Sequence, residues 1–146
     1  MAGANVTLDQ DETHRALQRA VKRLDDPRPL FDDIGQYLLR SHDERWLREV
    51  DADDAPWAKL KKATLARKKK KRPNAGKLVF DDHLQRLTVQ TFAAGVAIGS
   101  SEKYAATHQF GAPDRGIKAR PFLGVSDEDR EEINALAADY LVKALG

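Results

Sequence analysis

The fold is decided by the stretch TVQTFAAGVAIG, residues 88–99. Its two halves are rich in β-branched residues, and apolar side chains alternate with polar or small ones, which is typical of strands. A chain reversal at the small Ala-Ala-Gly junction would bring Val89 and Thr91 opposite Val96 and Ile98. The sequence therefore predicts a β-hairpin here, while the segments on both sides of it have helical patterns.

Two long helices are predicted before the hairpin. Apolar residues recur at helical spacing over residues 11–24 and again over 30–50, and two prolines in the segment 25–29 separate the two runs. Asp54 is a candidate N-cap of a third, short helix with Pro56 in its first turn. The residues expected on that third helix are Trp57, Leu60 and Thr64.

Shorter elements are expected around the hairpin. A helix is predicted over residues 78–87, and another inside residues 100–110. Gly111 is expected to end the second of these by adopting a left-handed conformation. The Arg-Pro pair that begins at Arg120 predicts an extended segment, because proline restricts the residue before it.

The C-terminal helix has the strongest pattern. Ser126 is a good N-cap, and three acidic residues follow it in the first turn, where the helix dipole favours negative charge. Apolar residues then recur at helical spacing from Ile133 to Ala144. The order of N-terminal helices, small antiparallel hairpin or sheet, and amphipathic C-terminal helix predicts an α+β fold. A length of 146 residues fits one domain, residues 1–146.

The composition excludes several classes of protein. No segment approaches the roughly 20 apolar residues that a membrane-spanning helix needs, so no membrane partner is expected. The chain contains no cysteine. Disulfides, thiolate metal sites and cysteine nucleophiles are therefore excluded, and folding does not depend on redox state.

Positive charge is concentrated in one segment, although the net charge is only +2. Lys59 to Lys77 contains ten basic residues and no acidic ones, and Pro73 and Gly76 break regular structure. We expect a flexible basic loop at about residues 66–77. It is either a solvated loop or a contact for DNA phosphates or an acidic partner, although it lacks aromatic residues for base stacking. The candidate contacts are Arg67, Lys68, Lys69, Lys70, Lys71 and Arg72.

Residue patterns for catalysis or for metal and cofactor binding are absent from the sequence. The four histidines are scattered without metal-ligand spacing, and there is no nucleophile elbow or phosphate-binding loop. Asp81 and Asp82 are adjacent, so they point in different directions on a helix and suit a helix start. His108 is expected to be a packing histidine. We expect no enzyme activity, cofactor, metal or small-molecule substrate; a nuclease that uses Asp81, Asp82 and His108 is the alternative.

Three segments, taken in order, resemble one protein family. The first contains Pro56-Trp57, Leu60 and Thr64, the second runs from Val96 to Gly111, and the third is Ile117 to Gly124. Their order and spacing resemble the phage virion morphogenesis family, the tail-completion proteins of Mu-like and P2-like phages. The resemblance covers roughly Pro56 to the C-terminus. Its candidate packing or interface residues are Trp57, Leu60, Thr64, Tyr104, His108, Phe110, Gly111, Arg120, Pro121 and Phe122.

The resemblance implies a structural virion protein of the head–tail connection, made in the host bacterial cytoplasm. It implies tail completion and head–tail joining by copies arranged in a ring, in contact with neck, tail-terminator or tail-tube proteins. Packaged DNA is a further candidate partner, through the basic loop. Two alternatives stay open: a terminator that caps the tail tube, and a DNA-binding module that uses the lysine-rich loop. Of the matched residues, Trp57 and Phe122 are expected in the core, and Arg120 is a candidate to pair with a carboxylate of the same or the neighbouring subunit.

Overall fold

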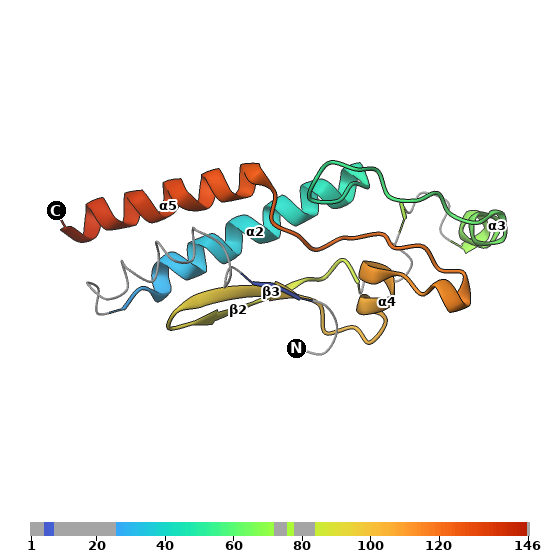
Figure 1. The fold of residues 1–146 in the computed structure, drawn as a ribbon, viewed down its shortest axis with the longest axis horizontal. Helices are drawn as coiled ribbons and strands as arrows, with labels where there is room; N and C mark the ends of the chain where they lie inside the picture. Colours follow the sequence, from blue (N-terminus) through green and yellow to red (C-terminus); the bar gives the residue numbers. More distant parts are fainter. Residues whose placement is uncertain (1–4, 8–25, 72–75, 78–83, 146) are drawn as a thin grey trace.

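The chain folds around a three-stranded antiparallel sheet in the order β1-β3-β2 (Figure 1). The structure, a computed structural model, describes residues 5–7, 26–71, 76–77 and 84–145. The central strand β3 (Gly95–Gly99) pairs with β2 (Thr88–Phe92) on one side and with β1 (Asn5–Thr7) on the other. Together with the helices around it, this sheet confirms the α+β fold.

The predicted hairpin is confirmed, and the structure fixes its register, which the sequence left open. Val89 pairs with Ile98 and Thr91 pairs with Val96, as the alternation of apolar residues indicates. The third strand β1 was not predicted, because a three-residue strand has no periodicity to recognise.

Two long helices lie side by side above the sheet (Figure 1). Helix α2 (Arg28–Arg48) packs on β2 and β3, and helix α5 (Asp127–Leu145) packs on α2. A Cβ at Gly35 would meet a methyl carbon of Val89 at 2.5 Å, so this glycine allows α2 to lie close to β2. The core between these layers consists of Leu30, Phe31, Ile34, Leu38, Val96, Ile98 and Ile133.

The predictions for these long helices are confirmed where the structure describes them. Helix α2 ends at Arg48, two residues before the predicted end, and Glu49 follows it with a left-handed conformation. The hydroxyl of Ser126 accepts a hydrogen bond from the amide of Asp129 at 3.0 Å, as expected of an N-cap. The predicted helix over 11–24 lies outside the described residues.

A second core cluster lies at the C-terminal end of α2. The ring of Trp46 contacts those of Trp57 and Phe122 edge-on, with centroids 5.3 Å apart in both pairs. Both predicted core aromatics, Trp57 and Phe122, are therefore buried as expected. The cluster is completed by Leu84, Ala105 and Leu123.

The prediction of a helix that begins at Asp54 is wrong. Residues 57–61 have no helical structure, because the amide of Trp57 donates to the carbonyl of Glu49 at 2.8 Å and the indole turns into the core. Asp54 has a positive φ of 61° inside a turn that Asp51 holds with its carboxylate. Of the residues expected on this helix, only Thr64 is helical.

The basic segment is helical rather than a loop as far as Lys71. Helix α3 (Lys62–Lys71) contains Arg67 and the four lysines 68–71. Lysine and arginine have high helix propensity, and positive charge in the last turn interacts favourably with the helix dipole. These two effects outweigh the repulsion on which the loop prediction rests. Arg72 and the rest of the segment up to residue 75 lie outside the described residues.

The shorter elements agree with the sequence in part. Helix α4 (Ala105–Phe110) ends at Gly111 as predicted, but Gly111 has a φ of +78° and a ψ of 174°, which is not the left-handed helical conformation expected of it. A short 3-10 turn η1 (Pro113–Arg115) follows. The predicted helix over 78–87 is not helical from Leu84 onward, and the rest of it lies outside the described residues. Among the helices that the structure describes, none is long and apolar enough to cross a membrane.

Candidate functional site

A groove of about 670 Å³ opens between α3, α4 and the segments that lead into and out of them. Six cationic side chains line it, and no acidic side chain does so among the described residues. Leucine and isoleucine side chains give it an apolar floor. We call this the basic groove; its cations are Lys59, Lys61, Arg67, Lys68, Lys118 and Arg120, and its floor is formed by Leu60, Leu84 and Ile117.

The basic groove collects residues from all three segments of the family resemblance. Leu60 and Thr64 come from the first segment, Tyr104 and His108 from the second, and Arg120 from the third. Arg67 and Lys68 of the predicted basic contacts also line it, whereas Lys69, Lys70 and Lys71 are exposed on α3. The remaining candidates lie elsewhere, with Phe110 largely exposed and Trp57 and Phe122 in the core beneath.

Arg120 holds two segments of the groove together. Its guanidinium donates to the carbonyls of Ala58 at 2.8 Å and Lys59 at 2.7 Å, and its amide donates to the carbonyl of His108 at 2.7 Å. Among the described residues, main-chain carbonyls take up this side chain and no carboxylate of the same chain pairs with it. Pairing with a carboxylate of a neighbouring subunit stays a prediction. Burial lowers the pKa of Arg120, but an arginine stays charged at neutral pH.

His108 and Tyr104 form one wall of the groove. Their rings meet edge-on with centroids 5.9 Å apart, so the predicted shared face is confirmed. Burial, and then the nearby charge of Arg120, lower the pKa of His108, which keeps the imidazole neutral at pH 7. No carboxylate orients this ring among the described hydrogen bonds, so the arrangement has the features of a packing histidine rather than a general base.

The motif that follows His108 has a structural role. The side-chain oxygen of Gln109 accepts hydrogen bonds from the amides of Phe122 and Leu123, both at 3.0 Å, and its nitrogen donates to the carbonyl of Leu123. A Cβ at Gly111 would lie 2.8 Å from the amide nitrogen of Ala119. Gln109 and Gly111 therefore allow α4 to pack closely against the extended segment 119–123 and to bond to it.

Lys68 is the one buried cation of helix α3, and it is 6% exposed. Its ammonium donates to the carbonyl of Gly76, which joins the helix to the chain beyond its C-terminal end. Lys68 is therefore part of the folded structure and not one of the solvated cations of the predicted loop.

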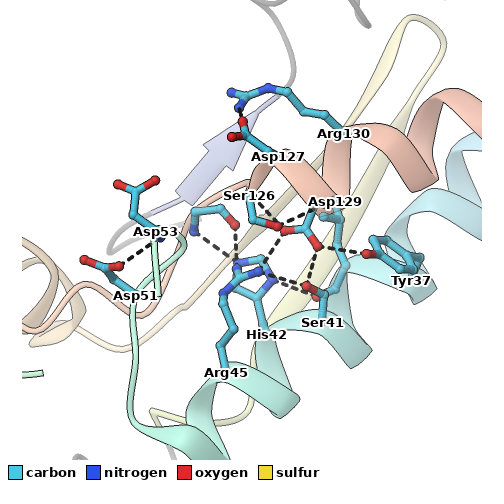
Figure 2. A network of polar contacts seen from close by, with 12 residues as sticks. Tyr37, Ser41, His42, Arg45, Asp51, Asp53, Ser126, Asp127, Asp129 and Arg130 are labelled. Carbon is cyan, nitrogen blue, oxygen red and sulfur yellow. Dashed lines mark hydrogen bonds and ion pairs between the residues drawn. The ribbon is translucent and has the colours of Figure 1, made fainter. Parts of the chain in front are cut away.

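A buried polar network lies between α2 and α5, outside the basic groove (Figure 2). At its centre is Asp129, whose carboxylate accepts hydrogen bonds from Tyr37 at 2.9 Å, from Ser41, and from Arg45 at 2.8 Å. The amide of Ser126 also donates to it, which completes a capping box at the start of α5. Arg45 further donates to the hydroxyl of Ser41 and to the carbonyl of Gly124.

The network fixes the charge of its members. Burial alone would raise the pKa of Asp129, but the hydrogen bonds from Ser41, Ser126 and Arg45 outweigh it and lower the pKa to about 2. Burial, together with the hydrogen bond to Asp129, raises the pKa of Tyr37. The network therefore contains a carboxylate, a guanidinium and a neutral phenol at neutral pH.

His42 is neutral for a geometric reason. Its Nδ1 lies 2.7 Å from the carbonyl of Leu38, and its Nε2 lies 3.2 Å from the amide nitrogen of Gly124. The ring must donate from Nδ1 and accept at Nε2, so it cannot carry a second proton without losing a bond. Burial, and then the charge of Arg45, lower the pKa of His42 from 6.5 to about 4.

This network was not predicted from the sequence. Its only indication was the first turn of α5, where Ser126 and Asp129 have capping-box spacing. Ser41 and Arg45 lie one turn apart within the apolar stripe of α2, which places two polar groups on a buried face. That pattern is a usable indication of a buried ion pair, although it does not identify the partner carboxylate.

An acidic face surrounds the network at the surface. A shallow hollow of about 250 Å³ lies at the junction of α2 and α5. We call its exposed acidic side chains the acidic face: Glu44, Asp53, Asp54, Asp127 and Glu128. Across the described parts of the chain, no cluster of His, Asp or Glu side chains is arranged to hold a metal ion.

Comparison with known proteins identifies the family to which this chain belongs. The model of the phage virion morphogenesis family matches residues 8–142 of this chain. The match covers the basic groove and the polar network, and it extends further toward the N-terminus than the motifs from Pro56 onward. No curated protein and no solved structure matches.

Proposed function

Because this chain belongs to the phage virion morphogenesis family, we propose that it is a structural protein of the head–tail connection of a tailed phage. In this role it acts in tail completion and head–tail joining, as one of several copies arranged in a ring. The observation that carries the proposal is the family match over residues 8–142, which spans nearly the whole chain.

The structure supports a binding role rather than a catalytic one. The basic groove brings cations and an apolar floor together at the surface, which suits contact with another macromolecule. Its histidine lacks the partners of a general base, and its arginine is bound to main-chain carbonyls. The proposed partners are further copies of the chain and the neck, terminator or tail-tube proteins next to it in the virion.

Electron microscopy of lysates from a phage that lacks this gene tests the proposal. DNA-filled heads beside separate tails of normal length are the expected result, and supplying the gene in trans should restore joined particles. Normal, joined particles in the absence of the gene would overturn the proposal.

A terminator that caps the tail tube is the alternative within the same class. It predicts a different phenotype, because tails that lack a cap grow to uncontrolled length. The length distribution of the separate tails in the same micrographs therefore decides between the two roles.

A DNA-binding module is the alternative from another class, and the exposed cations of the basic groove, Lys59, Lys61, Arg67 and Lys118, are the observation in its favour. This reading predicts binding of double-stranded DNA that weakens steeply with salt, because phosphate contacts release counterions. A gel-shift titration of the purified protein at low and moderate salt tests it, and no shift at low salt would exclude it.

The hypothesis that the protein is a nuclease has little support from the structure. Asp81 and Asp82 lie outside the described residues, and His108 has the features of a packing residue. Incubation of the protein with DNA, with and without a divalent metal, is the direct test. Cleavage that is lost on substitution of Asp81, Asp82 and His108 by alanine would establish a nuclease.

A further inference from the structure

The basic groove has a composition that suits a protein ligand better than DNA. Lys59, Lys61 and Lys118 are exposed at its rim, and Leu60 and Ile117 are half-buried in its floor. DNA phosphates need only the cations, because the backbone offers no apolar group to cover the floor. A ligand that buries a hydrocarbon side chain between carboxylates would satisfy both the floor and the rim.

The chain itself carries a surface of that kind. The acidic face contains exposed Glu44, Asp53 and Glu128 around the junction of α2 and α5, and the exposed cation Arg48, which also lines this hollow, pairs with Asp54 at 2.9 Å. Leu47 lies three residues after Glu44 on the same helix, and it is 80% exposed. This part of the surface therefore offers an apolar side chain next to carboxylates.

The two surfaces belong to different parts of the molecule. The groove lies between α3 and α4, toward one end of the molecule, whereas α5 begins near the middle of the molecule (Figure 1). One copy can therefore use its groove and its acidic face at the same time. Two different, complementary surfaces give a heterologous contact, which closes into a ring when the rotation between copies allows it.

We propose that the basic groove of one copy binds the acidic face of the next copy, so that the chains join head to tail. Lys59, Lys61 and Lys118 face Glu44, Asp53 and Glu128 of the neighbour, and the neighbour's Leu47 covers the apolar floor. The inference rests on the proposed ring-forming role and names the two surfaces that meet in it.

Engineered cysteines test the contact inside phage particles. Because the chain has no cysteine of its own, a pair introduced by substitution is unique. Each of Lys59, Lys61 and Lys118 is replaced by cysteine together with one of Glu44, Asp53 and Glu128, and every double variant is supplied in trans to the phage lacking the gene. Restored particles are then purified and oxidised mildly, since a disulfide forms only where the two Cα atoms approach within about 7 Å.

The expected result is a ladder of dimers, trimers and larger covalent species from at least one pair. Chains with a single cysteine provide the control, because they can form a dimer at most. Joined particles that contain the protein but give no ladder with any of the pairs would overturn the inference and leave the proposed function standing. Normal particles without the gene would overturn both.

A charge exchange provides a second measurement that does not depend on cross-linking geometry. Changing Lys59, Lys61 and Lys118 to Glu, or changing Glu44, Asp53 and Glu128 to Lys, should each lower the yield of joined particles about tenfold or more. Combining both sets of substitutions in one chain should restore the yield, because the attraction returns with opposite sign. Failure of the combined variant to recover, while each set alone still folds, would contradict the pairing.

Matched controls lie far from both surfaces. Exchanging Asp139 and Lys143, which pair at 2.9 Å near the end of α5, should leave the yield unchanged. Leu47→Ala should lower the yield of joined particles, whereas Phe92→Ala, at another exposed apolar residue on the hairpin, should not.

Salt-sensitive DNA binding that is lost on neutralising Lys59, Lys61 and Lys118, with no ladder in particles, would assign the groove to DNA instead.

Discussion

The guanidinium of Arg45 lies 2.8 Å from the carboxylate of Asp129, and the two side chains are only 6% and 2% exposed. This ion pair joins α2 to the first turn of α5. Since both ions are removed from water, each depends on the other and on the surrounding hydrogen bonds for its stability. The pair therefore fixes how α5 begins and where it lies on α2.

Removing one member of this pair should strongly destabilise the protein. Arg45→Met leaves the charge of Asp129 buried without its partner, and we expect the free energy of unfolding to fall by about 3–5 kcal/mol. Urea denaturation followed by circular dichroism measures it. Arg48→Ala is the matched control, because Arg48 pairs with Asp54 at the exposed surface and should cost less than about 1 kcal/mol. Similar losses in both variants would contradict the buried pair.

Stability should fall as the pH is lowered from 7 to 4. The pKa of His42 is lowered from 6.5 to about 4 in the folded chain, so the unfolded chain binds a proton in this window that the folded chain does not. Stability is therefore complete above pH 6.5 and decreases toward pH 4, by about 3 kcal/mol. Urea denaturation at several pH values measures the slope.

The variant His42→Gln separates this contribution from the others. Glutamine offers an amide donor and a carbonyl acceptor but does not titrate, so the slope between pH 6.5 and 4 should become shallower. The further loss below pH 4 should remain, because the lowered pKa of Asp129, about 2, makes its contribution disappear between roughly pH 4 and 2. An unchanged slope above pH 4 would rule out His42 as its source.

Two glycines with positive φ should respond differently to alanine. At Gly111, with φ +78°, a Cβ would lie 2.8 Å from the backbone nitrogen of Ala119, and we expect a loss of about 2–3 kcal/mol. At Gly116, with φ +65°, the Cβ would meet only the mobile end of Lys61, so the loss should be about 1 kcal/mol. Thermal unfolding of both variants gives the comparison, and equal shifts in Tm would contradict the close approach at Gly111.

The lysines of α3 should fall into two groups. Lys68→Ser removes a buried side chain and its hydrogen bond to the carbonyl of Gly76, and we expect a loss of about 1–2 kcal/mol. Lys70→Ser, at an exposed position of the same helix, should change stability by no more than about 0.5 kcal/mol. Chemical denaturation of the two variants distinguishes a folded helix from a solvated loop, in which the two losses would be equal.

Much of the fold follows from patterns within the sequence. The hairpin, helix α2 and the capped start of α5 are each encoded by periodicity and local residue preferences. The prediction of a helix from Asp54 was wrong because the packing of Trp57 against Trp46, a contact between distant parts of the fold, outweighs the local preference for a cap at Asp54. The prediction of a basic loop was wrong up to Lys71, because the helix propensity of the lysines outweighs the repulsion between them and the segment forms α3.

The candidate site could be predicted only as a set of residues. The family motifs contain Leu60, Tyr104, His108 and Arg120, but nothing in their spacing indicates that they surround one groove. The carbonyl partners of Arg120 lie in a segment about sixty residues earlier, and no local pattern predicts such a contact. The acidic face likewise forms only when the end of α2 meets the start of α5.

The pairing of β1 with β3 has a consequence for how the chain acquires its structure. Asn5 lies opposite Gly99, so a segment made early must wait for a strand made much later. The long loop between β1 and β3 closes slowly, and such pairing of strands distant in the sequence lowers the folding rate. Until the strand at 95–99 has been synthesised, β1 has no partner, and the sheet is completed only after most of the polypeptide has left the ribosome.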